Sequence, residues 1–470
     1  DNFLVDYWKE KTGFDFEIVI LPNVNPDEKL NLMFSGGEVH GMVFEKDFTA
    51  PSRYYNQGML QPFDDYIEGS YFFDTFEKYQ GKGQIDGQQY AAIIPPDGIP
   101  CASGLYIVRK DTLNSIGIME QPQTMDEFTQ MLRDIKKQTE MVPLGVFDAP
   151  SMDSWDMVAA FFGMAQTHSA WAVRNGQVVL RHVQPEAYDY LVYCKQLYDE
   201  GLIPQDFLSL TADTLDQIYL GGQAATMIHD GVWRMPTFMP ASEENGFDSR
   251  FMDYPTGASG QPSMGHADRF FSQNIFLSNQ AQNPGDYVKL LDFLALPETI
   301  KVNNYGLEGE HYTEDAEGNM TLTEAGESLQ WAVYYRNIFL PEDWYSVYGV
   351  NANWAEFYYP SERHSVGTTD FDPVEFMPQR AEDVALQAEL KETIIDQFFA
   401  QAVTGEIELT PESFDTMVRQ WMDGGGQAMQ EYYTEQYTAL GSPDYSDMYV
   451  SYLPEEHPAY TGKYLWDGHE

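Results

Sequence analysis

Hydrophobic and polar residues repeat along the chain with two different periods, and each period predicts a different element. In residues 14–20, FDFEIVI, every second side chain is apolar, which predicts a half-buried strand. Residues 104–109, GLYIVR, predict a second strand. Pro26 precedes residues 27–38, DEKLNLMFSGGE, which predict a helix that ends at Gly36 and Gly37.

Three further helices are predicted where a capping signal precedes apolar residues at helical spacing. Thr124 and Glu127 form the pattern of a capping box. Asn283-Pro284 and Thr410-Pro411 open the other two helices. The buried faces are expected to comprise Phe128, Met131, Leu132 and Ile135, then Tyr287, Leu290, Leu291 and Leu294, then Phe414, Met417, Val418 and Trp421. Short strands that alternate with helices predict α/β lobes with mostly parallel sheets. Since 470 residues exceed one comfortable core, we expect two lobes.

The charge balance excludes one class of partner. The chain has 74 Asp and Glu against 26 Lys and Arg, a formal net charge of −48. Such a surface repels phosphate groups, so we exclude DNA and RNA as partners. The acidic residues are spread along the chain and interleaved with aromatic residues, which argues against a disordered tail. Two interpretations of these acidic residues stay open: they keep the protein surface solvated, or they favour a cationic ligand.

The two cysteines indicate little about the compartment. Cys194 falls on an apolar stripe with Leu191 and Leu197, so we expect a small core residue. A disulfide with Cys101 stays open at this point. No apolar run approaches membrane-spanning length, and the chain starts at Asp1 without a signal peptide, so we expect a processed or trimmed product.

Several strings, in matching order from about residue 7 to about residue 440, resemble the family 1 extracellular solute-binding proteins of carbohydrate ABC transporters. The likeness is greatest to the large lipoprotein branch that includes the alginate-binding proteins. The most specific string is NPGDYVKLLDFLALPETIKVNNYGLEGEHYT, residues 283–313. The other strings are residues 27–38, 104–128, 169–207 and 404–437. Residues 443–470 have no clear counterpart in the family.

The resemblance implies an α/β, two-lobed periplasmic-binding-protein-like fold of type II. Its ligand cleft would lie between lobes joined by a multi-strand hinge. The N-terminal lobe would comprise residues 1–109 and 274–325, and the C-terminal lobe residues 110–273 and 326–470. Closure of the lobes on a ligand is a known motion of such proteins.

The same resemblance implies the substrate-binding component of an ABC importer. It would be a monomer that delivers an oligosaccharide to membrane permease subunits. It would be anchored outside the bacterial cytoplasmic membrane by a lipidated cysteine that precedes this chain. Residues 136–145, KKQTEMVPLG, stand where calcium-binding relatives carry an acidic insert, so we predict neither a metal nor a cofactor.

Sugar rings need flat aromatic surfaces for their CH faces and polar side chains for their hydroxyls. The leading candidate is Trp233, which either stacks on ligand or packs at the hinge; Asp230 and Arg234 flank it. Trp155 opens a predicted helix and either stacks on ligand or packs locally. Asp97, in a loop stiffened by prolines, could accept hydrogen bonds from two hydroxyls.

Two aromatic strings supply the remaining candidates. In LPEDWYSVYGVNANWAEFYY, we expect Trp344, Tyr345 or Trp354 to reach the ligand, while the other aromatic residues pack. In YGLEGEHYT, His311 and Tyr312 either line the cleft edge or belong to a structural turn shaped by the two glycines. Because basic residues are few, a neutral oligosaccharide is favoured over a uronic acid polymer.

Enzymatic function is not predicted. No GxSxG, HExxH, phosphate-binding-loop or CxxC motif occurs, and the nine histidines do not cluster at metal-ligand spacing. A carbohydrate-active hydrolase would need two carboxylates across a cleft, but 74 acidic residues make that signal uninformative. We therefore predict no catalytic residue. A binding protein for a peptide or another polar solute is the second alternative, because one fold serves many ligands.

Overall fold

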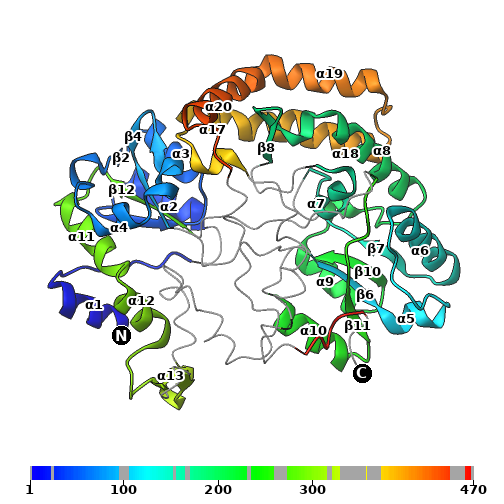
Figure 1. The fold of residues 1–470 in the computed structure, drawn as a ribbon, viewed down its shortest axis with the longest axis horizontal. Helices are drawn as coiled ribbons and strands as arrows, with labels where there is room; N and C mark the ends of the chain where they lie inside the picture. Colours follow the sequence, from blue (N-terminus) through cyan, green and yellow to red (C-terminus); the bar gives the residue numbers. More distant parts are fainter. Residues whose placement is uncertain are drawn as a thin grey trace. The chain divides into compact units, whose positions relative to one another are not determined.

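The computed structural model divides the chain into two units, each built from segments that are distant in sequence (Figure 1). The first unit comprises Asp1–Gly98, Phe270–Val350 and Val374–Leu386, and the second comprises the remainder. The structure describes residues 3–22, 26–94, 105–151, 155–164, 170–229, 234–258, 273–314, 320–328, 356, 372–444 and 461–466.

The sheet of the first unit is centred on β12 (Gln273–Ser278). Its antiparallel partners are β1 (Met42–Glu45), β2 (Leu60–Gln61) and β5 (Ala91–Ile94). Alternating side chains of β12 enter different cores: Ile275 and Leu277 join one cluster, and Phe276 joins another. Both faces of this sheet are therefore covered, as expected for an α/β unit.

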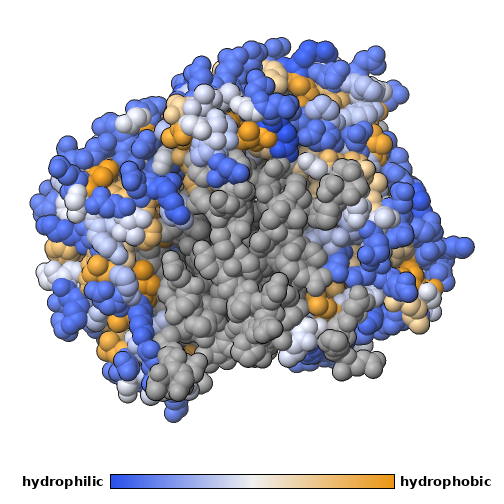
Figure 2. Space-filling view, in the orientation of Figure 1, coloured by the Kyte–Doolittle hydropathy of each residue, from blue (hydrophilic) through white to orange (hydrophobic). Residues whose placement is uncertain are grey.

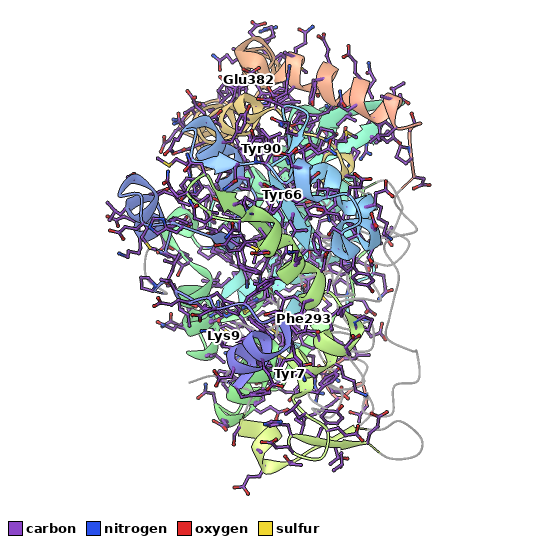
Figure 3. The ribbon with its side chains drawn as sticks, turned by 90° about the vertical axis from the view of Figure 1, so that its left-hand side faces the viewer. Tyr7, Lys9, Tyr66, Tyr90, Phe293 and Glu382 are labelled. Carbon is purple, nitrogen blue, oxygen red and sulfur yellow. The ribbon has the colours of Figure 1, made fainter. Side chains whose placement is uncertain are left out.

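The first unit also contains several helices. They are α1 (Phe3–Thr12), α2 (Pro26–Ser35), α3 (Ala50–Asn56), η1 (Asp64–Tyr66), α4 (Tyr71–Thr75), η2 (Glu77–Gly83), α11 (Pro284–Leu294), α12 (Pro297–Tyr305), α13 (Glu324–Ser328) and η9 (Pro373–Phe376). Two small hairpins complete the unit: β3 (Gln84–Ile85) with β4 (Gln88–Gln89), and β13 (Tyr312–Glu314) with β14 (Met320–Leu322). Figure 3 shows Tyr7 of α1 beside Phe293 of α11, with ring centroids 6.1 Å apart.

The sheet of the second unit has the strand order β11-β6-β10-β7. These strands are β11 (Ser249–Met252), β6 (Leu105–Arg109), β10 (Ala224–His229) and β7 (Val142–Gly145). Only β10 and β7 are parallel within this sheet, and the first sheet is antiparallel. The prediction of mostly parallel sheets is therefore wrong for the described strands. The pairing of β6 with β10 and β11 also puts residues 105–109 in the second unit, although we had predicted them in the first lobe.

Helices surround this sheet and extend into a helical layer. The helices are α5 (Lys110–Ser115), α6 (Met125–Gln138), α7 (Asp156–Ala159), η4 (Ala160–Phe162), η5 (Arg181–Val183), α8 (Pro185–Asp199), η6 (Phe207–Ser209), α9 (Ala212–Leu220), α10 (Met235–Glu244), η10 (Lys391–Asp396), α18 (Gln397–Thr404), α19 (Pro411–Trp421), η11 (Met422–Gly426) and α20 (Gln427–Ala439). The unit boundary falls within α17 (Ala381–Leu390). A hairpin joins β8 (Trp171–Arg174) to β9 (Gln177–Leu180), and its turn residues, Asn175 and Gly176, both have positive φ.

The helices predicted from caps are confirmed. Thr124 accepts a hydrogen bond from the backbone N–H of Glu127, although the Glu127 carboxylate accepts from Gln123 rather than closing the capping box. Thr410 and Ser413 do form a complete capping box at α19. The strand predicted over residues 14–20 is wrong, because this described segment is neither helix nor strand. Phe14, Phe16 and Ile18 nevertheless pack against the first core, whereas Ile20 is exposed.

The C-terminal segment pairs with the outer edge of the second sheet. The backbone N–H of Phe251 donates to the carbonyl of Tyr464 at 2.6 Å, and the N–H of Trp466 donates to the carbonyl of Phe251 at 2.9 Å. Tyr464 and Trp466 are both buried. Residues 461–466 therefore cover the exposed edge of β11, which protects it from pairing with another chain.

The surface and the interior of the described residues differ as the sequence predicts. The described residues on the face in Figure 2 are mainly hydrophilic, with scattered apolar residues. Cys194 is a free, fully buried thiol on α8, which confirms its core position, while Cys101 lies outside the described residues. No helix in the described part of the chain is both long and apolar enough to cross a membrane.

Candidate ligand-binding site

The register of the second sheet brings the ends of four strands to one edge. Because β7 and β10 are parallel, their carboxyl ends lie at the same edge. Leu105 pairs with His229, so the beginning of β6 lies there as well. Met252, the last residue of β11, pairs with Tyr106 and ends beside it. We call this side the carboxyl edge; in α/β sheets, ligands bind outside the carboxyl ends of the strands.

Five of the predicted site residues belong to segments that begin or end at the carboxyl edge. The segment with Asp97 leads into β6, Trp155 follows β7, and Asp230, Trp233 and Arg234 follow β10. Of these, only Trp155 and Arg234 are within the described residues; Asp97, Asp230 and Trp233 lie outside them.

Trp155 is a packed residue. Its side chain is fully buried, and its indole N–H donates to the carbonyl oxygens of Phe147 and Asp148 at 3.0 and 3.1 Å. The ring meets Phe207 edge to face, with centroids 5.3 Å apart. A sugar ring needs an open indole face, which this arrangement does not offer. The expectation that Trp155 stacks on ligand is therefore corrected in favour of local packing.

Hydrogen bonds fix the connection that follows β7. Asp148 has a φ of 64° and donates its backbone N–H to the carbonyl of Phe207 at 3.0 Å. The Tyr190 hydroxyl donates to the carbonyl of Pro150 at 2.5 Å, and the Ser151 hydroxyl donates to the carboxylate of Asp396. Together with Trp155, these contacts make the described part of the connection a rigid border of the carboxyl edge.

Arg234 directly precedes α10 as its N-cap residue and contacts two carboxylates. Its guanidinium Nη2 lies 2.8 Å from the Asp216 carboxylate and also bonds to Asp213, both on α9. The second carboxylate oxygen of Asp216 lies 3.0 Å from Nε2 of His229, the last residue of β10. The predicted ligand-binding residue Arg234 is thus paired within the protein. Asp216 contacts both residues that bracket the connection 230–233.

The first unit has a comparable polar edge that the sequence analysis missed. Glu45 at the end of β1 pairs with Asn274 at the beginning of β12. The Asn274 amide donates to the carbonyls of Glu45 and Asp47 at 2.9 and 3.2 Å, and Asp47 forms an ion pair with Arg53 at 3.1 Å. The side-chain oxygen of Asn274 is buried and has no hydrogen-bond partner among the described residues. The detectable signal was a polar run, EKD, directly after a strand.

His311 and Tyr312 form part of a structural turn. His311 is buried, stacks on Phe3 with centroids 4.8 Å apart, and accepts a hydrogen bond at Nδ1 from the backbone of Leu307 at 3.0 Å. Tyr312 is also buried, and burial is the main cause that raises the pKa of its phenol. The glycines of this turn, at positions 306 and 309, have φ values of 80° and 81°. These contacts favour the structural alternative over a cleft edge.

The other predicted aromatic contacts, Trp344, Tyr345 and Trp354, lie outside the described residues. Glu356, two positions after Trp354, is described and buried, and its carboxylate accepts hydrogen bonds from the backbone N–H groups of Thr461 and Lys463. In the described ranges, no group of three or more His, Cys, Asp and Glu residues is arranged to hold a metal ion.

Comparison with known proteins identifies one matching family, and solved structures with the same fold are also found. The family model for the bacterial extracellular solute-binding protein matches residues 4–301. The chain is 21% identical over 449 residues to the lipoprotein LipO of Bacillus subtilis (strain 168), covering 89% of this chain and 86% of LipO.

Two solved structures have the same fold at low sequence identity. The alginate-binding protein AlgQ2 without calcium ion superposes with a TM-score of 0.67 at 18% identity, covering 93% of this chain and 94% of AlgQ2. The substrate-binding protein FusA of S. pneumoniae in complex with kestose superposes with a TM-score of 0.67 at 16% identity, covering 93% and 96%.

Proposed function

Because the chain belongs to the bacterial extracellular solute-binding protein family, we propose that it captures a neutral oligosaccharide for an ABC importer. The solved structures confirm the two-lobed, type II fold predicted from the sequence. Proteins of this family bind solutes for transporters and work with permease subunits. Our proposal adds the class of solute, the residues that hold it, and its capture in a cleft between the two lobes.

The observation that carries the proposal is the convergence of the carboxyl edge. One end of each of the strands β6, β7, β10 and β11 lies at this edge; in the sequence, Asp97 precedes β6, and Asp230 and Trp233 follow β10. In the proposed complex, Trp233 stacks on the face of a sugar ring, while Asp97 and Asp230 accept hydrogen bonds from its hydroxyls. Trp344, Tyr345 and Trp354 are the proposed aromatic contacts from the later segment.

Charge supports a neutral ligand. Arg234 is the described cation closest in sequence to Trp233, and two carboxylates already neutralise it. A uronic acid would need an available guanidinium for a bidentate ion pair. The whole chain is strongly acidic as well, with a net charge of −48. AlgQ2 is named for alginate, whereas FusA is described in complex with kestose, so the fold itself does not decide the ligand's charge.

The proposal extends to assembly and location. The protein would act as a monomer, anchored outside the cytoplasmic membrane by a lipidated cysteine, and it would bind no nucleic acid and catalyse no reaction. The similarity to LipO, a lipoprotein, supports the anchor. A binding protein for peptides or other polar solutes is the alternative in a different ligand class.

A thermal melting screen tests the proposal. Ligand that prefers the folded protein raises the melting temperature by mass action, and at 100 times Kd the gain is about 2.7 kcal/mol. The panel comprises short neutral oligosaccharides, galacturonate and alginate oligomers, and short peptides. We expect a rise with neutral oligosaccharides, which mass spectrometry should recover unaltered. A rise with peptides alone would overturn the proposal, and consumption of the sugar would reveal a hydrolase.

A matched pair of variants tests the contact residue. Trp233→Ala should weaken binding of the best oligosaccharide on the order of tenfold, because stacking on an indole is lost. Tyr71→Ala removes another aromatic residue, which is 39% exposed at the beginning of α4 in the first unit, and should leave Kd unchanged. Equal Kd values for wild type and Trp233→Ala would remove Trp233 from the proposed site.

A further inference from the structure

One helical segment of the second unit contains a turn that is wider than an α-helical turn. Residues Lys391–Asp396, η10, are π-helical and join α17 directly to α18. The buried side chains give the reason. Leu390 is followed by Ile395 five positions later, and Ile395 is followed by Phe399 four positions later. A step of five is one residue longer than an α-helical turn, so the π turn absorbs one inserted residue and keeps Leu390 and Ile395 on the same buried face.

The same pattern recurs at the second π-helical segment, η11. The buried residues Trp421 and Gly426 are again five positions apart, and Met429 and Tyr433 continue the face with steps of three and four. A Cβ added at Gly426 would collide with the Trp421 ring, so these two residues lie one above the other. The five-residue step therefore coincides with a π turn at both places.

The first π turn also brings two charged side chains together. Lys391 Nζ lies 2.9 and 3.1 Å from the two carboxylate oxygens of Asp396. In an α-helix, residues five positions apart point about 140° away from each other, because each residue turns the helix by about 100°. The same carboxylate accepts a hydrogen bond from the hydroxyl of Ser151, which is buried in the connection after β7. Asp396 thus links the helix to the border of the carboxyl edge.

We propose that the π turn is a conformational lock for this border. It turns Asp396 toward Ser151, Lys391 balances the charge of the carboxylate, and the bond to Ser151 fixes the connection after β7. If the same residues formed an α-helical turn while Leu390 stayed in the core, Asp396 would rotate by about 100° away from Ser151. Asp396 is therefore a positioning residue of the free protein, whichever ligand the protein binds.

Hydrogen exchange of the ligand-free protein, measured by mass spectrometry, tests the lock. The reporter is the peptide that contains Asp148, whose backbone N–H donates to the carbonyl of Phe207 at 3.0 Å. Asp396→Ala and Ser151→Ala should each speed exchange of this peptide about tenfold, because a hydrogen bond to a charged group is lost. The double variant should exchange no faster than either single variant, since both substitutions remove the same contact.

Asp199→Ala is the matched control. Asp199 also pairs with a lysine, Lys195, at 2.9 Å, but with the ordinary spacing of four residues on α8. Its removal should leave exchange of the Asp148 peptide unchanged. Exchange of β10 should stay at the wild-type rate in all four variants. Wild-type exchange at Asp148 in Asp396→Ala, or equally faster exchange at Asp148 and β10, would overturn the lock.

Deletion of one residue tests the inserted turn itself. Removing Thr393, which is exposed, puts Leu390 four positions before Ile395 and Lys391 four positions before Asp396. An α-helix accommodates both spacings, so the buried face and the ion pair are retained. We expect the melting temperature of this variant to stay within about 5 °C of the wild-type value.

Deletion of Val192 is the control for this second test. Val192 is 44% exposed and lies within α8, an uninterrupted α-helix with buried residues on both sides of it. Its deletion turns one half of the buried face out of the core, so the melting temperature should fall by about 10 °C or more. Equal losses in the two deletion variants would overturn the inserted turn. A failed oligosaccharide screen would overturn the proposed function alone, because both tests of the lock use the free protein.

Discussion

Replacing Trp155 by Phe separates packing from ligand binding at the carboxyl edge. The substitution keeps an aromatic ring beside Phe207 but removes the indole N–H that donates to the carbonyls of Phe147 and Asp148. A lost hydrogen bond at a buried site costs about 1 kcal/mol. The smaller ring leaves a cavity of roughly 40 Å³, which adds about 1 kcal/mol at ~24 cal/mol per Å³. We therefore expect a loss of about 2 kcal/mol in the free energy of unfolding.

The assay is thermal unfolding of the free protein combined with calorimetric titration of the best oligosaccharide. Trp155→Phe should lower the melting temperature by several degrees, since about 1 kcal/mol corresponds to ~2–4 °C in a domain of 150–250 residues. Its Kd should stay close to the wild-type value, whereas Trp233→Ala should show the reverse pattern. An unchanged melting temperature with a Kd weakened tenfold would refute the packing assignment of Trp155.

Three other predictions concern stability. Trp466→Ala should lower the free energy of unfolding by about 3–5 kcal/mol, because the Trp466 side chain is only 1% exposed and packs beside β11. A melting curve identical to that of wild type would contradict this. Burial holds the pKa of His182 well below its usual 6.5. The free energy of unfolding should therefore fall as the pH drops below about 6.5, because the unfolded chain then binds a proton that the folded protein does not. In denaturant titrations across pH, the free energy of unfolding of His182→Gln should decline less steeply than that of wild type. Gly306→Ala should lower the denaturation midpoint more than Gly309→Ala, because an added Cβ at position 306 would lie 2.6 Å from His311 while position 309 is open; equal midpoints would refute the steric argument.

Local interactions explain which elements could be predicted from the sequence. The capping residue Thr410 and the apolar face that follows it act within a few turns of one helix, and α19 begins where they predict. Residues 14–20 alternate as a strand does, and Phe16 and Ile18 do pack on the first core. Alternation reports that one face is buried, but it carries no information about a neighbouring strand. The segment therefore follows the burial pattern as far as Ile18, with Ile20 exposed, and it joins no sheet among the described strands.

The sequence indicates which residues of the candidate site stand near strand ends, but it does not indicate which contacts their side chains make. Residues that follow a strand could be recognised, and Trp155 and Arg234 do stand next to strands β7 and β10 at the carboxyl edge. Arg234 pairs with Asp213 and Asp216 of α9, and the Trp155 ring packs on Phe207, so these contacts depend on tertiary packing that the sequence pattern does not report. For the same reason the contact of Asn274 with Glu45 was missed, since it depends on the register of β12 against β1.

A shared fold can serve charged and neutral ligands when the supporting contacts and the selective contacts are separate. AlgQ2 and FusA superpose on this chain at 18% and 16% identity, and their descriptions name alginate and kestose. In this chain, the buried Trp155 and the ion pair of Asp216 with Arg234 stabilise the border of the carboxyl edge. The exposed Asp213 contributes charge at little structural cost, because surface ion pairs stabilise proteins only weakly. Changing such a residue alters the potential while the border stays intact, so charge can diverge faster than the fold.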